Sequence, residues 1–248
     1  MGSINVMEES LIDLTREELQ SFEPEEISIP IIVIDDQSTI VDVEDACAKL
    51  LSGRKALGFD TETKPCFKKG QHHDVALLQL SSEKVVILVR LSKIENKEIY
   101  KPIIDILENK RILKVGIAIG DDAKGLYDSY GLITNKILDL RDLASASGIG
   151  ALSLSKIYAI LFEKRISKSQ QLSDWEKSEM TDAQIRYAAL DAYAGLRIYL
   201  KLRGNVTKEM IHHFEIPKPK KKKRRYRRKV NNLTPKNKVE SDVQKSHS

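Results

Sequence analysis

Short apolar runs separated by polar turns divide the chain from position 27 onward into predicted strands and helices. Runs rich in apolar and β-branched residues predict strands at 55–61, 75–80, 85–89, 112–119 and 137–139, and an edge strand or a docking segment at 27–34. Apolar residues at helical spacing predict helices at 43–51, 99–107 and 121–130, with Gly131 as the stop signal of the last one. The region 141–202 is predicted to be nearly all helix.

The order of these elements predicts an α/β domain. Four residues separate the runs at 75–80 and 85–89, which is the spacing of antiparallel strands joined by a tight turn. Strands come first and then alternate with helices, which favours a mixed sheet flanked by helices, with a helical C-terminal half. We expect an acidic N-terminal extension at 1–26 with a short helix near 15–19, a central domain at 27–210 and a tail at 211–248.

The formal net charge of +5 conceals two segments of opposite sign. Residues 218–248 contain 13 Lys and Arg and two acidic residues, which leaves 28 basic and 34 acidic residues in 1–217. Ten of the positive charges lie within 218–229, and such a block repels itself, stays disordered and binds polyanions. We expect this block to contact the phosphate backbone of nucleic acid; a solvated tail and a nuclear-import signal are the alternatives.

Length and composition indicate one intracellular domain. A chain of 248 residues with 41% hydrophobic content can bury one full core. No apolar stretch approaches the roughly 20 residues that cross a bilayer, and the N-terminus lacks a basic region followed by an apolar core. We therefore expect a soluble cytoplasmic protein, or a nuclear one if the source is eukaryotic, without membrane contact. Cys47 and Cys66 lack zinc-site spacing and are expected to be free thiols.

Two acidic residues lie at and just beyond the end of the predicted strand at 55–61. Asp60 and Glu62 are two positions apart, so their side chains project to the same side of an extended strand. Two carboxylates on one face repel each other unless a cation lies between them. A polar strand end with two solvated acids is the alternative, because a lone Asp-x-Glu pattern is common.

A second acidic position lies on a predicted helix near the end of the domain. Thr181 and Gln184 have the spacing of a capping box, which predicts a helix start near Asp182. Tyr187 and Asp191 are then four residues apart and share a face. Small residues surround them and leave room for a metal and a phosphate. Alternatively, the tyrosine is a half-buried aromatic and the aspartate a surface acid.

A third acidic position follows the predicted strand at 112–119. Asp122 lies at the start of the next helix, just after Gly120. Its neighbour Asp121 could take the same role or simply cap the helix. Carboxylates in apolar company are costly to bury without a positive partner, and Mg²⁺ or Mn²⁺ is the usual occupant of an all-oxygen site. The sequence therefore favours a metal-dependent phosphate enzyme.

Taken together, these motifs resemble the 3′-to-5′ exonucleases of the DEDD superfamily, tyrosine subclass, and most closely the RNase D and Werner-syndrome exonuclease branch. Five segments, in the family's order, carry the resemblance: Leu-Gly-Phe-Asp-Thr-Glu at 57–62, Val-Ala-Leu-Leu-Gln-Leu at 75–80, Val-Gly-Ile-Ala-Ile-Gly-Asp-Asp at 115–122, Leu-Ser-Asp-Trp at 172–175 and Tyr-Ala-Ala-Leu-Asp-Ala-Tyr-Ala-Gly at 187–195. The resemblance makes Trp175 part of a family signature that positions the last helix. Glu179 and Met180 depart from the Pro-Leu that relatives often carry there.

The resemblance implies a ribonuclease-H-like fold and a two-metal mechanism with Mg²⁺ or Mn²⁺. By this analogy Asp60 bridges both cations, and Glu62 and Asp191 complete the site that activates the attacking water. Asp122 holds the second cation, largely through waters, and Tyr187 orients or helps to deprotonate the nucleophile. The expected substrate is a nucleic acid with a single-stranded or recessed 3′ end, and the products are nucleoside 5′-monophosphates.

The sequence also allows other interpretations of some of these features. The alternative to an active exonuclease is a nucleic-acid-binding or scaffold protein with an idle nuclease-like fold. Lys164, Arg165 and Lys168 could contact the substrate backbone or form a solvated helix end. The His-His-Asp sequence at 72–74 lies in a polar loop, where adjacent histidines rarely converge on one ion. The sequence indicates neither DNA nor RNA as substrate, and no oligomeric state.

Overall fold

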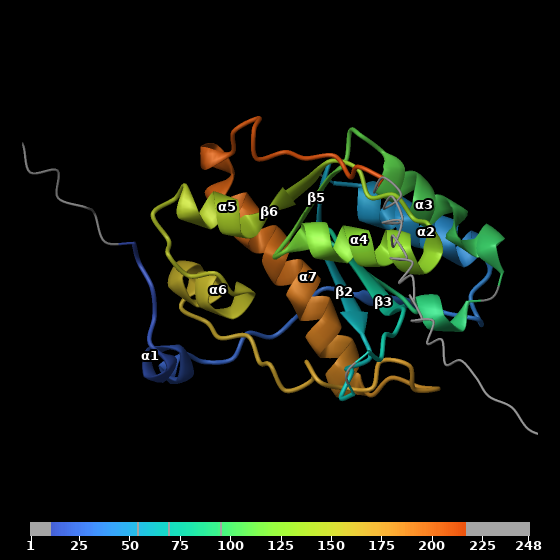
Figure 1. Cartoon of the computed structure of the whole chain (residues 1–248), viewed down its shortest axis with the longest axis horizontal. Coiled ribbons are helices and arrows are strands. Elements are labelled where there is room, and N and C mark those ends of the chain that lie inside the picture. Colours follow the sequence, from blue (N-terminus) through green and yellow to red (C-terminus); the bar gives the residue numbers. More distant parts are fainter. Residues whose placement is uncertain (1–10, 54, 69, 95, 217–248) are drawn as a thin grey trace, which may run out of the picture. The chain divides into compact units, whose positions relative to one another are not determined.

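A six-stranded mixed sheet forms the centre of the computed structural model, which describes residues 11–216 except 54, 69 and 95 (Figure 1). The strand order is β1-β4-β3-β2-β5-β6. The β2–β3 and β3–β4 pairs are antiparallel, and the β1–β4, β2–β5 and β5–β6 pairs are parallel. The strands are β1 (Ile31–Ile34), β2 (Ala56–Thr63), β3 (Val75–Ser81), β4 (Val86–Val89), β5 (Leu113–Gly116) and β6 (Ile137–Asp139). The predicted mixed sheet of an α/β domain is confirmed.

Seven α-helices accompany the sheet in the described part of the chain. They are α1 (Arg16–Ser21), α2 (Ile40–Leu51), α3 (Lys101–Glu108), α4 (Ile119–Tyr130), α5 (Leu140–Ser145), α6 (Leu154–Phe162) and α7 (Asp182–Leu202). Three short 3₁₀ helices lie at Leu91–Lys93, Lys97–Tyr100 and Arg203–Asn205. Among the described residues, no helix is both long and apolar enough to cross a membrane. The basic block at 218–229 and the predictions made for it lie outside the described residues.

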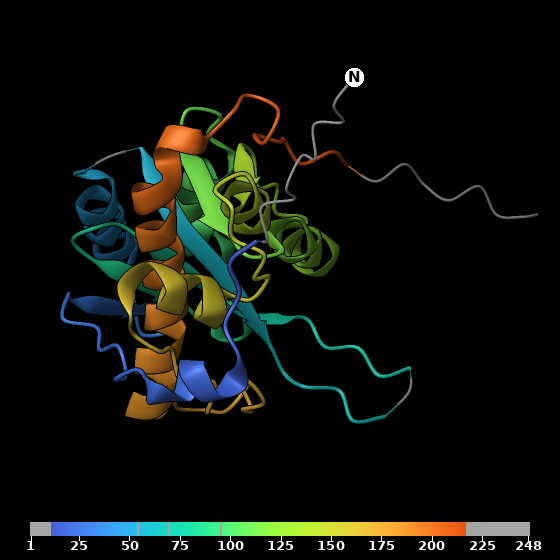
Figure 2. The same cartoon turned by 90° about the vertical axis from the view of Figure 1, so that its left-hand side faces the viewer.

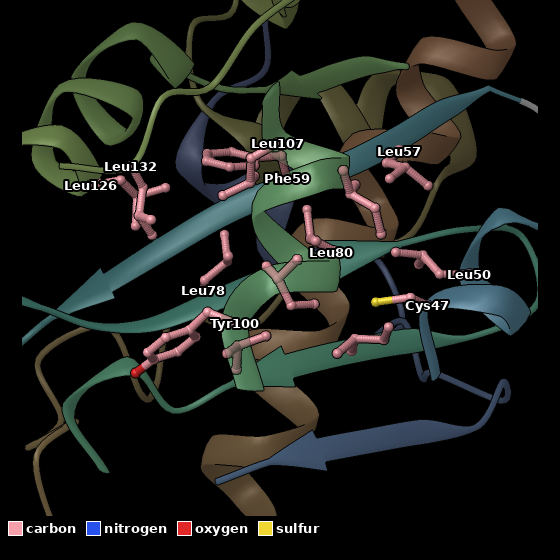
Figure 3. Packing of buried hydrophobic residues seen from close by; sticks show 14 of the residues in the cluster. Cys47, Leu50, Leu57, Phe59, Leu78, Leu80, Tyr100, Leu107, Leu126 and Leu132 are labelled. Carbon is pink, nitrogen blue, oxygen red and sulfur yellow. The ribbon is translucent and has the colours of Figure 1, made fainter. Parts of the chain in front are cut away.

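Helices cover both faces of the sheet, and the alternation of side chains along each strand decides which residues meet which helices. On one face Phe59, Leu78 and Leu80 are buried with the apolar sides of α2, α3 and α4 (Figure 3). On the other face Leu77 and Leu88 are buried in a cluster with alanines of α7. Burial of apolar side chains on both faces is the main stabilising term for this architecture.

Local sequence signals define several helix ends as predicted. The Thr181 hydroxyl accepts a hydrogen bond from the Gln184 backbone, and the Gln184 side chain accepts one from the Thr181 backbone. This capping box starts α7 at Asp182 and orients the helix that carries Asp191. Helix α4 ends at Gly131, which has a φ of 71° and so adopts the left-handed conformation that glycine allows.

Three predicted elements differ from the structure. The strand expected at 112–119 ends at Gly116, because Ala118 takes a left-handed conformation and α4 begins at Ile119. The strand expected at 27–34 starts only at Ile31. The region 141–202 holds three helices, but 163–181 is not helical, so the prediction of nearly continuous helix was wrong there. Periodicity alone cannot show that this segment is held by tertiary contacts.

The non-helical segment 163–181 is fastened to the domain by specific groups. Trp175 is buried, and the Gln184 side chain donates a hydrogen bond of 3.3 Å to the Asp174 carbonyl. The buried Arg90 guanidinium donates to the carbonyls of Lys177, at 2.5 Å, and Ser178, at 2.8 Å. These bonds satisfy backbone groups that a helix would have satisfied itself, so the segment holds a fixed path without regular structure.

The N-terminal segment contacts the domain through backbone and side-chain bonds. Arg165 exchanges backbone hydrogen bonds with Glu23 and Glu25, and its side chain donates to the Phe22 carbonyl at 2.9 Å. The Glu25 carboxylate accepts a hydrogen bond of 2.5 Å from the Tyr158 hydroxyl. The described residues from 11 to 216 belong to one compact unit. The expected division at 26 and 210 stays a prediction.

Gly58 lets α7 approach β2 closely. A Cβ atom at this position would lie 1.9 Å from the Ala192 carbonyl oxygen of α7, a distance that backbone atoms cannot tolerate. Figure 2 shows α7 lying along β2, with the connection between β2 and β3 projecting from the body. The distance between this helix and this strand is therefore set by the absence of a side chain.

We expect Gly58→Ala to lower the free energy of unfolding by about 3 kcal/mol or more, because helix and strand must separate to admit the methyl group. Urea unfolding followed by circular dichroism measures the effect. Gly53→Ala is the matched control, since a Cβ there meets nothing within 4 Å. Equal stability of the two variants would show that α7 does not depend on this contact.

Candidate active site

Three carboxylates from β2 and α7 meet on the sheet face that α7 covers. Asp60 and Glu62 lie on the same side of β2, as their spacing predicts. Asp191 is 9% exposed on α7, one residue before the Ala192 carbonyl that faces Gly58. One oxygen from each of the three carboxylates lies within 4.8 Å of the other two. Residues 131 positions apart in the sequence thus form one acidic cluster.

The cluster opens into a cavity of about 360 Å³, a size common for small-ligand sites. Tyr187 of α7 lines it together with the three carboxylates. Other walls come from residues 116–117 at the end of β5, 152–155 at the start of α6, and 166–168 with Gln171 in the non-helical segment. The acids therefore lie in a recess that solvent and a small ligand can enter.

Burial and mutual repulsion raise the pKa of every carboxyl group in the cluster. Burial, followed by the charges of Asp122, Asp191 and Glu62, raises the pKa of Asp60 well above its usual range. The pKa of Glu62 rises to about 9 and that of Asp191 to about 7, with burial as the main cause in both. In the absence of a cation the site favours protons over charge.

Tyr187 is tied to the acidic cluster. Its side chain is hydrogen-bonded to that of Asp191, four residues further along α7. Burial and the negative charges of Asp191 and Glu62 raise the pKa of the Tyr187 hydroxyl, so it stays protonated at neutral pH. The ring packs against the buried Trp175, with ring centroids 6.0 Å apart. The indole therefore lies beside the tyrosine ring of α7, while the role expected for Trp175, positioning the last helix, stays a prediction.

Asp122 lies outside the group of three. It sits in the first turn of α4, on the opposite face of the sheet from α7. The Thr61 hydroxyl donates a hydrogen bond of 2.5 Å to Asp122 Oδ1. Burial raises the pKa of Asp122 to about 6, and its charge contributes to the raised pKa of Asp60. Asp122 is therefore close to the site without reaching the space between the other three acids.

Sequence reasoning overlooked Thr61. Strand alternation turns its side chain away from Asp60 and Glu62, which gave no reason to include it. The structure shows that this opposite direction is what lets it hold Asp122. The one sequence signal that could have indicated its role is its place as a polar, β-branched residue between two acids of one strand.

Of the three basic residues weighed from the sequence, Lys168 belongs to the cavity. It lines the recess, and its positive charge lowers the pKa of Asp191 against the effect of burial. Arg165 instead holds the N-terminal segment. In the polar loop at 72–74, His73 Nδ1 lies 3.2 Å from Glu176 Oε1, so this histidine contacts the 163–181 segment.

The donor set fits a hard divalent cation. Asp60, Glu62 and Asp191 supply only carboxylate oxygens, which Mg²⁺ and Mn²⁺ prefer, and their repulsion is relieved when a cation binds between them. Three acids with raised pKa values in one recess are also typical of a functional site. The cluster is therefore able to bind a metal ion.

Comparison with known proteins agrees with this geometry. A sequence model of the 3′-5′ exonuclease family matches residues 33–207, which include every element that contributes an acid to the cluster. The chain belongs to the 3′-5′ exonuclease family. The resemblance to the DEDD superfamily that the motifs indicated is thereby confirmed.

Individual relatives of this exonuclease-family chain are larger proteins. It is 34% identical over 145 residues to mouse "Exonuclease 3'-5' domain-containing protein 2", covering 55% of this chain and 22% of the relative. It is 33% identical over 168 residues to the mouse bifunctional 3'-5' exonuclease/ATP-dependent helicase WRN, covering 66% of this chain and 12% of the relative. The chain therefore spans less than a quarter of the length of either protein.

A solved structure shows the same fold. The Trypanosoma brucei RNase D complex with RNA U12 superposes with a TM-score of 0.61 at 19% identity, over 74% of this chain and 65% of that one. The ribonuclease-H-like architecture expected from the sequence is thus confirmed.

We expect the metal-free protein to lose stability as the pH rises from about 5 to about 9. The folded state holds protons on Glu62 and Asp191 up to pKa values of about 9 and about 7, whereas the unfolded chain releases them near its ordinary values. The folded state therefore binds more protons in this window, and raising the pH favours unfolding. Thermal unfolding in a chelator at stepped pH measures the slope.

Glu62→Gln should flatten this slope between pH 7 and 9, and Glu44→Gln, at an exposed position of α2, is the control. Added Mn²⁺ should raise the melting temperature more at pH 8.5 than at pH 6, because cations and protons compete for the same oxygens. A stability that rises with pH in chelator, or a Glu62→Gln variant with the wild-type slope, would contradict the electrostatic description of the site.

Proposed function

We propose that the chain is a metal-dependent 3′-5′ exonuclease that hydrolyses phosphodiester bonds of DNA or RNA and releases nucleoside 5′-monophosphates. The convergence of Asp60, Glu62 and Asp191 in one recess carries this proposal, because the chain belongs to a 3′-5′ exonuclease family and retains a donor set suited to hard cations. Buried like charges without such a role would cost stability with no compensating benefit.

Two divalent cations, Mg²⁺ or Mn²⁺, are the proposed cofactors. Asp60, Glu62 and Asp191 would hold them, with Asp60 shared between the two. When bound, such ions neutralise the charge on the attacking and leaving oxygens of an in-line displacement. Asp122 would hold the second ion through waters, which agrees with a carboxylate that lies near Asp60 and is steadied by Thr61.

Tyr187 is proposed to orient the attacking water through its hydroxyl group. Its raised pKa keeps the proton on the oxygen at neutral pH, so the hydroxyl acts as a neutral hydrogen-bonding group and not as a base. The bond to Asp191 and the packing of the ring against Trp175 hold the hydroxyl at the wall of the recess. Pre-oriented polar groups of this kind lower the barrier without reorganisation.

Nucleic acid is the proposed partner, and the enzyme would act on it from a single-stranded or recessed 3′ end. Lys168 is a cation at the wall of an otherwise acidic recess, which suits a contact with a substrate phosphate. The similar RNase D of Trypanosoma brucei was solved in complex with RNA U12. The basic block at 218–229 would add affinity for the phosphate backbone that does not depend on base sequence.

We expect Asp60→Asn to lower the rate of nucleotide release by about 10³-fold or more, because charge stabilisation by bound cations is worth several kcal/mol. The assay follows 5′-labelled and 3′-labelled single-stranded and recessed DNA, RNA and hybrid ends with Mg²⁺ or Mn²⁺. A 3′-5′ exonuclease releases the 3′ label at once and shortens the 5′-labelled strand stepwise.

The matched control is Asp45→Asn, which changes an exposed aspartate of α2 paired with Lys49 and should leave the rate unchanged. Wild type and Asp60→Asn behaving alike would exclude this chemistry. Tight nucleic-acid binding with no nucleotide release under any metal would instead favour the alternative function, a binding or scaffold protein with an idle site.

Removal of 218–248 should raise KM by about tenfold at moderate salt and leave kcat nearly unchanged, because the basic segment aids capture of phosphate and not the chemical step. Removal of 230–248 alone is the control, since it takes away only three of the 13 basic residues together with both acidic ones. A collapse of kcat at constant KM would contradict this prediction, because it would show that the tail contributes to turnover and not to substrate capture.

A further inference from the structure

Gln79 lies directly opposite Asp60 in the sheet. It belongs to β3, and in the antiparallel β2–β3 pair the Cα partner of Asp60 is Gln79. Directly opposite residues of an antiparallel pair place their side chains on the same face, with Cβ atoms about 4.5–5.5 Å apart. The Gln79 amide and the Asp60 carboxylate therefore share the face that α7 covers.

The Gln79 side chain is completely buried and has no hydrogen-bond partner. Its exposed fraction is 0%, and neither Nε2 nor Oε1 is hydrogen-bonded to any described group. Leaving a buried polar group unpaired costs about 1–3 kcal/mol, and the large majority of such groups in folded proteins are paired. The Gln79 amide is therefore available to a partner placed against it on this face of β3.

The other neighbours of Gln79 in the sheet form no hydrogen bond with its amide. Leu88 on β4 is its second cross-strand partner, and Leu77 precedes it by two positions on the same face of β3. Ser81, two positions further, already donates its hydroxyl to the Ser82 carbonyl. Asp60 is thus the one ionisable residue directly opposite Gln79 in the sheet.

We propose that Gln79 is a positioning residue for Asp60, donating a hydrogen bond from its amide, directly or through one enclosed water, to the carboxylate when that carboxylate binds a cation. This inference rests on the proposed function in one respect, namely that Asp60 is a metal ligand. A neutral donor suits this place, because it can fix the orientation of a carboxylate without competing with the cation for the site.

A carboxylate that binds a cation is ionised, and an ionised carboxylate accepts strong, charge-assisted hydrogen bonds. Hydrogen-bond partners behind metal ligands typically change metal affinity by about 10–100-fold when they are removed.

The test compares wild type with Gln79→Met, which keeps the length of the side chain and removes the amide. Mn²⁺ binding by calorimetry should weaken by about 10-fold or more. Urea unfolding of the metal-free variant should show unchanged or higher stability, because an unpaired buried amide has been replaced by an apolar group. Nucleotide release should recover when Mn²⁺ is raised by the same factor, which loss of packing would not allow.

Leu77→Met is the matched control, since it changes a buried residue on the same face of β3, opposite Glu62, without altering a polar group. It should leave Mn²⁺ affinity within about twofold of wild type. Wild-type Mn²⁺ affinity in Gln79→Met would overturn the proposal for Gln79 and leave the proposed function intact. Loss of stability in metal-free Gln79→Met would also overturn it, by showing that the amide is paired within the fold. Absence of Mn²⁺ binding in wild type would instead remove the proposed function and this inference together.

Discussion

The close approach of α7 to β2 is the constraint on which the rest of the site depends. Gly58 has no side chain, and the Ala192 carbonyl occupies the place where a Cβ would stand. Asp191 directly precedes Ala192 on the helix, and Asp60 follows Gly58 by one strand period. The contact between two backbones therefore brings three carboxylates within 4.8 Å of one another. A side chain at position 58 would move the helix and open the cluster.

The acidic cluster suits cation binding but lowers the stability of the fold. The carboxylates are held in surroundings that raise their pKa values, so the metal-free site lowers the stability of the fold at neutral and higher pH. The apolar clusters on both faces of the sheet offset this cost. Strand β2 serves both sides, because Asp60 and Glu62 face α7 while Thr61 holds Asp122 of α4. A cation converts the repulsion into attraction, which is the physical basis of the proposed enzyme.

Much of this arrangement could be predicted from the sequence, because its signals are local. The period of two along β2 placed Asp60 and Glu62 together, and the capping box at Thr181 fixed the start of α7 and so the position of Asp191. The remainder depends on contacts distant in sequence. The path of 163–181 is held by Arg90 and by burial of Trp175, and no periodicity encodes such bonds. The early start of α4 follows from the left-handed conformation of Ala118. Alanine seldom adopts this conformation, so the sequence does not predict it.

The most direct test is a crystal structure of the full chain grown with Mn²⁺, using anomalous scattering to locate the ions. We expect anomalous density between the carboxylates of Asp60, Glu62 and Asp191, with α7 packed against Gly58. Ordered carboxylates that point to separate surfaces, with no ion density between them at saturating Mn²⁺, would contradict it.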